Sequence, residues 1–149
     1  MIVLAQSAPE VAEVRELFAE YAQALGFSLC FQGFAEELAS LPGTYGPPRG
    51  ALLLAPGLGC VGVHPLDGTV AEMKRLFVRP AARGTGLGRA LALAACDAAR
   101  SRGFTRLRLD TIASSMGAAL SLYRSLGFGE IPPYRENPIV SALYLERLL

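Results

Sequence analysis

Residue types with specialised chemistry are scarce in this 149-residue chain, and their scarcity excludes several classes of function. There is no tryptophan, one histidine (His64) and three cysteines that form no Cys-x-x-Cys pair. Structural zinc sites need four closely spaced Cys and His ligands, so no metal is expected. A Ser–His–Asp or Cys–His catalytic site would depend on His64, and no nearby pattern supports one. We expect Cys30, Cys60 and Cys96 to be buried as small apolar residues.

The chain also lacks a strong excess of either charge sign and long apolar runs. The formal net charge is +1, so composition gives no indication of nucleic-acid binding. No uninterrupted apolar run reaches the roughly 18 residues of a membrane span, and the first residues do not resemble a signal peptide. Hydrophobic residues make up 52% of the chain, which is typical of a globular protein. We expect one domain over residues 1–149, located in the cytoplasm.

The hydrophobic pattern predicts strands and helices in a mixed order. Ser7 and Pro9 begin a first helix that ends near Gly26. Further helices are expected around 34–41, 86–103 and 116–126, and strands at 2–6, 51–56, 60–66, 69–78, 106–112, 128–131 and 142–149. Strands that come first as hairpins and then as a strand–helix–strand crossover indicate a mixed sheet in an α/β or α+β domain.

A glycine-rich loop, RGTGLGR at 83–89, lies between a predicted strand and a predicted helix. The dinucleotide pattern G-x-G-x-x-G fails because Arg89 and Leu91 stand where its third glycine is needed. No Gly-Lys pair exists for a P-loop. An anion is still indicated, because glycines allow close approach and the first amides of a helix lack partners. On glycine spacing alone, a plain turn flanked by solvated arginines stays an alternative.

Two motifs, about 35 residues apart, closely resemble those of the GNAT superfamily of acetyl-CoA-dependent N-acetyltransferases. Arg83, Gly86 and Gly88 match its R/Q-x-x-G-x-G/A loop, and the segment 119–128 matches A-x-x-L-Y-x-x-L-G-F. The stretches EMKRLFVRP and LGFGEIPPYRENP resemble a group of small bacterial members. The resemblance implies a mixed, mostly antiparallel sheet of about six or seven strands flanked by about four helices. Acetyl-CoA would lie in a splay between two parallel strands.

The resemblance implies acetyl-CoA as co-substrate and no metal. The pyrophosphate would lie on the loop amides and the pantetheine arm along the preceding strand. Met116 stands where the family often has an asparagine, so that contact is missing or comes from Ser114 or Ser115. The cofactor-binding residues implied in this way are Leu76, Phe77, Val78, Arg83, Gly84, Thr85, Gly86, Leu87, Gly88, Arg89, Met116 and Tyr123.

The chemistry that the resemblance implies is direct attack of a primary amine on the thioester. The amine has to lose a proton first and the CoA thiolate has to gain one. Tyr123 matches the family tyrosine that donates this proton, with a core tyrosine as the alternative. Glu72 matches the position of a base in one branch of the superfamily, and a surface ion pair or a water chain is its alternative. Strand alternation predicts that Glu72, Lys74, Leu76 and Val78 share one face.

The acceptor is less defined. In the resembled family the segment between the last strands shapes the acceptor pocket, so Tyr134, Asn137 and Glu72 are candidate substrate-binding residues. An ordinary loop is the alternative there. The implied partners are acetyl-CoA and an amine of a small molecule or a protein, without nucleic acid or membrane. The family often forms homodimers, and the oligomeric state stays open. A non-catalytic acyl-CoA-binding sensor of the same fold is the alternative function.

Overall fold

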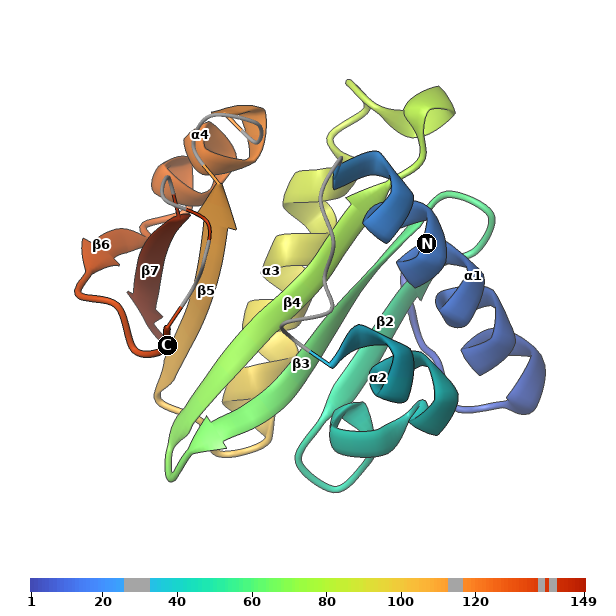
Figure 1. The fold of residues 1–149 in the computed structure, drawn as a ribbon, viewed down its shortest axis with the longest axis horizontal. Helices are drawn as coiled ribbons and strands as arrows, with labels where there is room; N and C mark the ends of the chain where they lie inside the picture. The colour runs from blue at the N-terminus through green and yellow to red at the C-terminus, as the bar shows by residue number, and fades with distance from the viewer. Residues whose placement is uncertain (26–32, 113–116, 137–138, 140–141) are drawn as a thin grey trace.

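The structure is a computed structural model that describes residues 1–25, 33–112, 117–136, 139 and 142–149 (Figure 1). Within these residues, seven strands form one sheet in the order β1-β2-β3-β4-β5-β7-β6. The strands are β1 (Val3–Leu4), β2 (Ala51–Ala55), β3 (Gly59–Asp67), β4 (Val70–Val78), β5 (Arg106–Ile112), β6 (Gly129–Ile131) and β7 (Ala142–Leu148). In the described part of the chain only β4 and β5 pair in parallel, which confirms the predicted mixed, mostly antiparallel sheet.

Helices cover both faces of the sheet (Figure 1). Helices α1 (Ala8–Leu25) and α2 (Phe34–Ser40) pack on one face, and α3 (Leu87–Ser101) and α4 (Gly117–Ser125) pack on the other. Two short 3₁₀ turns occupy Gly43–Tyr45 and Pro80–Ala82. The predicted helices are confirmed to within about two residues at each end. Among the described residues, no helix combines the length and the apolar character needed to cross a membrane.

Local signals fix the helix ends as the sequence predicts. The Ser7 hydroxyl accepts a hydrogen bond of 3.3 Å from the Glu10 amide, and the Glu10 carboxylate accepts one of 3.0 Å from the Ser7 amide. This reciprocal capping satisfies amides that the first turn of α1 leaves without partners. After α4, Gly127 has φ +92°, a conformation that glycine adopts without strain. Among the cysteines, Cys60 and Cys96 are buried and Cys30 lies outside the described residues.

A β-bulge interrupts β4. Cys60 lies opposite Phe77, but Gly62 lies opposite Lys74, so one residue of β3 faces two residues of β4. Arg75 takes up the extra length with φ +62°, a backbone conformation that is uncommon for residues other than glycine. The bulge therefore changes which side chains of β4 share a face.

The prediction that Glu72, Lys74, Leu76 and Val78 share one face is wrong, and the bulge is the physical reason. Glu72 and Lys74 line a pocket on the side of α2. Leu76 and Val78, beyond the bulge, pack instead against the core that α3 covers. Two-residue alternation holds only while a strand pairs one to one, and Arg75 ends that regularity.

Strands β4 and β5 separate soon after they begin to pair. Val70, Ala71 and Glu72 pair with the first three residues of β5, and no further pair joins the two strands among the described residues. Figure 1 shows β4 and β5 diverging from this end of the sheet towards the ends of both strands. The later part of β4 therefore has a strand partner only on its β3 side.

Gly62 is predicted to be intolerant of a side chain because the Tyr45 ring lies directly on it. A Cβ at Gly62 would lie 2.6 Å from Tyr45 Cε1. Tyr45 cannot retreat freely, since its ring centroid lies 5.7 Å from that of Phe18 and 5.5 Å from that of His64. We expect Gly62→Ala to lower the free energy of unfolding by about 1–3 kcal/mol, measured by chemical denaturation. Gly129→Ala, on β6 with no atom near its added Cβ, is the matched control. Equal losses in the two variants would contradict the packing argument.

Candidate functional site

A cavity of about 550 Å³ lies beside the end of β4, and we call it the loop cavity. Apolar residues of α1, β4 and α4 form one part of its lining, and the glycine-rich loop with the start of α3 forms the other. The lining residues are Tyr21, Ala24, Leu25, Leu76, Phe77, Val78, Ala82, Arg83, Gly84, Gly86, Leu87, Gly88, Ala118, Ala119 and Leu122. The cavity thus joins an apolar channel to a loop of exposed amides.

The loop has the backbone geometry of an anion site. Gly84 and Gly86 have φ +79° and +86°, and Gly86 is the residue from which α3 begins. The first turn of α3, with Leu87 and Gly88, borders the cavity. Its amides have no carbonyl partner within the helix, and the helix dipole adds partial positive charge there. Gly88 also keeps the cavity open, since a Cβ there would lie 3.6 Å from Leu122 and 3.8 Å from Val78.

The two arginines of the loop have different surroundings. Arg83 lines the loop cavity, and its Nε donates a hydrogen bond of 3.1 Å to the Val78 carbonyl. Arg89 instead donates a hydrogen bond of 3.3 Å to the Ser125 hydroxyl, and it does not line the cavity. Thr85 also lies outside the cavity lining, and its hydroxyl donates to the Ala82 carbonyl. The expected contact through Met116 falls outside the described residues.

A small gap of about 30 Å³ lies where β4 and β5 separate, and we call it the splay gap. It shares Tyr21 and Leu76 with the loop cavity, so the two spaces adjoin. Tyr123 lines the gap, and burial raises the pKa of its phenol. The hydroxyl therefore remains protonated at neutral pH and can donate a proton, but it cannot serve as a phenolate base. The complete lining is Tyr21, Met73, Lys74, Arg75, Leu76, Leu109, Asp110 and Tyr123.

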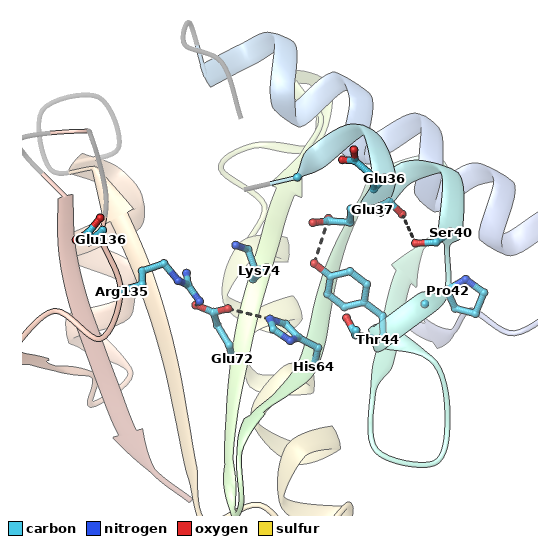
Figure 2. Close-up of a pocket in the computed structure, with 13 residues that line it drawn as sticks. Glu36, Glu37, Ser40, Pro42, Thr44, His64, Glu72, Lys74, Arg135 and Glu136 are labelled. Carbon is cyan, nitrogen blue, oxygen red and sulfur yellow. Dashed lines mark hydrogen bonds and ion pairs between the residues drawn. The ribbon is translucent and has the colours of Figure 1, made fainter. Parts of the chain in front are cut away.

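A third space of about 400 Å³, the side pocket, lies between β4, α2 and the segment after β6 (Figure 2). Lys74 lines both the side pocket and the splay gap. The loop cavity, the splay gap and the side pocket are therefore neighbours along β4, because each adjoining pair shares lining residues. The side pocket is lined by Gly33, Glu36, Glu37, Ser40, Pro42, Gly43, Thr44, Tyr45, His64, Glu72, Lys74, Arg135 and Glu136.

Glu72 is fully buried at the floor of the side pocket. Its carboxylate lies 2.8 Å from His64 Nε2 and 2.7 Å from Arg135 Nη2, and it accepts a 2.6 Å hydrogen bond from the Tyr134 hydroxyl. Burial by itself would raise the pKa of Glu72, but the hydrogen bonds from His64 and Arg135 outweigh it and hold the pKa far below its usual range. The carboxylate is therefore firmly ionised and a weak proton acceptor. Its ion-pair partner is Arg135, while the neighbouring Arg75 pairs elsewhere.

Arg135 connects the two strands that separate. Besides Glu72 on β4, its guanidinium lies 3.3 Å from Asp110 on β5. Tyr134 packs beside it, with its ring 5.0 Å from that of Tyr144 on β7. The structure thus brings Tyr134 together with Glu72 at the side pocket, while the third candidate of this group, Asn137, lies outside the described residues.

Sequence reasoning missed several residues of this site. No pattern in the sequence supports a catalytic site at His64, yet this residue lies opposite Glu72 in the β3–β4 ladder. The strands predicted at 60–66 and 69–78 contain this signal, since the Asp67-Gly68 turn between them favours a hairpin whose pairing brings 64 near 72. For Arg135 and Asp110 no local signal exists, because their contact depends on where separate segments meet.

A parallel strand pair that separates beside a glycine-rich strand-to-helix loop is the arrangement that the resemblance to the GNAT superfamily implies. Residues 46–128 match the model of the acetyltransferase (GNAT) family. An uncharacterized N-acetyltransferase of Schizosaccharomyces pombe is 39% identical over 142 residues, which cover 91% of this chain and 86% of that protein. The chain therefore belongs to the GNAT family.

Solved structures agree with this assignment. An acetyltransferase from Streptococcus agalactiae has the same fold, with a TM-score of 0.77 over 100% of this chain and 98% of that one at 22% identity. A GNAT family acetyltransferase from Elizabethkingia anophelis, solved with acetyl-CoA bound, is 26% identical with a TM-score of 0.57. That match covers 68% of this chain and 77% of the other.

Glu72 is predicted to make folding sensitive to acid. Because its pKa is depressed in the folded state, its stabilising contribution is complete above the ordinary value of about 4.3 and is lost as the pH falls towards the folded value. Below about pH 5, the free energy of unfolding of the natural protein should fall more steeply than that of Glu72→Gln, by up to about 1.4 kcal/mol per pH unit. Denaturation curves over this range test the slope.

The matched control for this measurement is Glu130→Gln, which removes an exposed carboxylate from β6 and so corrects for the loss of one charge. Parallel pH dependence in the natural protein and Glu72→Gln would show that the buried carboxylate does not have the proposed electrostatic role.

Proposed function

We propose that the chain transfers an acetyl group from acetyl-CoA to a primary amine. The observation that supports this most directly is that three adjoining spaces lie along β4 where it separates from β5. A donor on one side and an acceptor on the other would meet at the splay gap. Proximity of two bound reactants supplies a large part of a rate enhancement in two-substrate reactions.

The residues of the loop cavity fit acetyl-CoA. The amides at the start of α3 and the Arg83 guanidinium suit the pyrophosphate, and the apolar lining from Leu76 and Val78 suits a long thioester arm. Beyond Glu72, β4 has no strand partner on the β5 side among the described residues, so its amides and carbonyls are open to an extended ligand. When bound, acetyl-CoA supplies an acetyl group activated as a thioester. The acetyl-CoA bound to the Elizabethkingia relative supports this donor.

Proton transfer in the splay gap would fall to Tyr123. Its phenol is protonated at neutral pH and lines the space where a thioester sulfur entering from the loop cavity would lie. We therefore propose that Tyr123 donates a proton to the departing thiolate. Glu72 is proposed to hold the acceptor side in place through His64 and Arg135, because its ion pairing makes it a poor base. Water in the side pocket would then accept the proton of the amine.

The side pocket would hold the acceptor. Its mouth carries the exposed carboxylates of Glu36 and Glu136, and its floor carries Lys74 and Arg135. Such a mixture of charges suits a small polar amine better than an apolar one, since an apolar molecule would desolvate these groups without replacing their hydrogen bonds. The acceptor therefore stays a proposal, and it is defined only as a small polar amine.

The decisive experiment for the function is release of free thiol from acetyl-CoA across a panel of amines. Thiol release that needs both acetyl-CoA and an amine supports the proposed transfer. Binding of CoA without thiol release from any amine would favour the non-catalytic acyl-CoA sensor. Absence of both binding and release would contradict the donor assignment.

The donor site itself is tested at Gly88. Gly86 would be a poor choice, because its φ of +86° makes any side chain there strained. Gly88 has no such φ, and Gly88→Val would place methyl groups beside Leu122 and Val78 within the loop cavity. We expect CoA affinity, measured by calorimetry, to fall at least about tenfold, which corresponds to about 1.4 kcal/mol. Ala90→Val, on the exposed side of the same helix, is the control for valine in α3. Equal affinities in the two variants would exclude this cavity as the CoA site.

The proton-donor role is tested with Tyr123→Phe. Phenylalanine keeps the ring and its edge-on contact with Phe128, whose ring centroid lies 5.8 Å away, so the fold should be preserved. We expect kcat to fall roughly 10²-fold, as is typical for loss of a general acid, with little change in CoA affinity. Steady-state thiol release and calorimetry measure the two quantities. An unchanged kcat would remove Tyr123 from the mechanism.

A further inference from the structure

Lys74 is the only lysine of the chain, and it occupies a particular position. It lines both the splay gap and the side pocket, so it stands between the proposed donor and acceptor spaces. Leu76, two residues further along β4, lines the loop cavity. Figure 2 shows the Lys74 amine beside Arg135, within the pocket rather than directed away from it.

The surroundings of Lys74 shift its ammonium group towards the uncharged form. Burial lowers the pKa of the ammonium, and the nearby Arg75 and Arg135 act in the same direction. The carboxylates of Glu72 and Asp110 oppose this effect without reversing it. Both of these acids are also held by Arg135, which reduces the negative charge available to Lys74. A larger fraction of the side chain is therefore a nucleophilic amine than for an exposed lysine.

We propose that Lys74 is an internal acetyl acceptor, so that the protein acetylates its own Lys74 side chain when no amine occupies the side pocket. This inference rests on the proposed function, because it needs acetyl-CoA in the loop cavity. The Nζ atom forms a bond to the acetyl carbonyl carbon, and the bond between that carbon and sulfur breaks. The electron pair leaves with sulfur, which gains a proton, while the nitrogen loses one. The products are an amide on Lys74 and free CoA.

Acetylation of Lys74 would change the site in two ways. The amide has no charge, so the positive charge at the floor of the side pocket is reduced to that of Arg135. The added acetyl group also occupies space next to a gap of only about 30 Å³. An amide is far less reactive than a thioester and would not pass the acetyl group on. Self-acetylation should therefore slow turnover, and a bound acceptor amine should prevent it.

The unique lysine makes the test direct. The full chain is incubated with acetyl-CoA and no acceptor, and its mass and peptide map are measured over time. We expect one acetyl group on Lys74, and none on Lys74→Arg, which keeps the charge but offers no nucleophilic amine. The amino group of Met1, which is exposed, is the other primary amine, and peptide mapping separates it from Lys74. Acetylation confined to Met1, or none at all, would overturn the proposal.

Two controls separate the site from simple chemical reactivity. Gly88→Val, which is expected to weaken CoA binding at least about tenfold, should acetylate Lys74 more slowly in proportion when acetyl-CoA is below saturation. Protein unfolded in denaturant exposes the same amine without the cavities, and equal acetylation of Lys74 there would overturn the proposal. NMR of protein made with isotope-labelled lysine gives a readout of binding that does not depend on turnover. The spectrum is simple to assign, because Lys74 gives its single lysine signal. Its resonance should shift when CoA itself binds, and an unchanged resonance at saturating CoA would place Lys74 away from the thioester end.

The outcomes also distinguish this inference from the proposed function. Thiol release with an amine, combined with an unmodified Lys74 in the absence of amines, would reject self-acetylation and leave the acetyltransferase activity standing. Failure of thiol release under every condition would reject the proposed function. A thermal melt of Lys74→Arg that matches the natural protein shows that a negative result with this variant reflects lost chemistry rather than lost folding.

Discussion

The buried ion pair between Glu72 and Arg135 is the interaction on which the site depends. Where β4 and β5 part, backbone pairing can no longer hold the two halves of the sheet together. Arg135 takes over this role by contacting Glu72 on one strand and Asp110 on the other. Burying a carboxylate without partners would cost free energy of folding. The loss of any one partner of Glu72 is therefore expected to destabilise the site. Side chains therefore connect the two strands where their backbones no longer pair.

The bulge at Arg75 lets the single strand β4 line two different spaces. By turning the strand, it directs Glu72 and Lys74 to the side pocket and Leu76 and Val78 to the loop cavity. The bulged residue itself is used as an anchor, since the Arg75 guanidinium makes two hydrogen bonds of 2.9 Å to the Glu37 carboxylate. Pairs of this kind contribute more to a specific arrangement than to net stability, because burying both charges offsets their attraction. Here the pair between Arg75 and Glu37 holds α2 against β4, so that α2 forms one wall of the side pocket.

The sequence predicts the structural elements around the loop cavity better than those around the side pocket, and the reason is physical. Strands, helices and the glycine loop follow from short patterns, so the fold and the residues around Gly86 could be placed from the sequence. Glycine spacing and a helix start define an anion site through backbone geometry alone. The bulge at Arg75 could not be foreseen, because it depends on how β3 and β4 pair. The contact of Arg135 with Asp110 depends on segments 25 residues apart that meet only in the folded sheet.

This difference has a consequence for how such a fold acquires new substrates. A donor site made largely of backbone constrains few side chains, so it can persist while the rest of the chain changes. The side pocket, which we propose for the acceptor, is made of side chains from α2, β3, β4 and the segment after β6, and each can vary separately. Glu72 limits that freedom, since a change at His64, Tyr134 or Arg135 would remove a partner from a buried charge. Substrate preference is therefore freer to change at the mouth of the pocket, near Glu36 and Glu136, than at its floor, where stability and geometry are coupled.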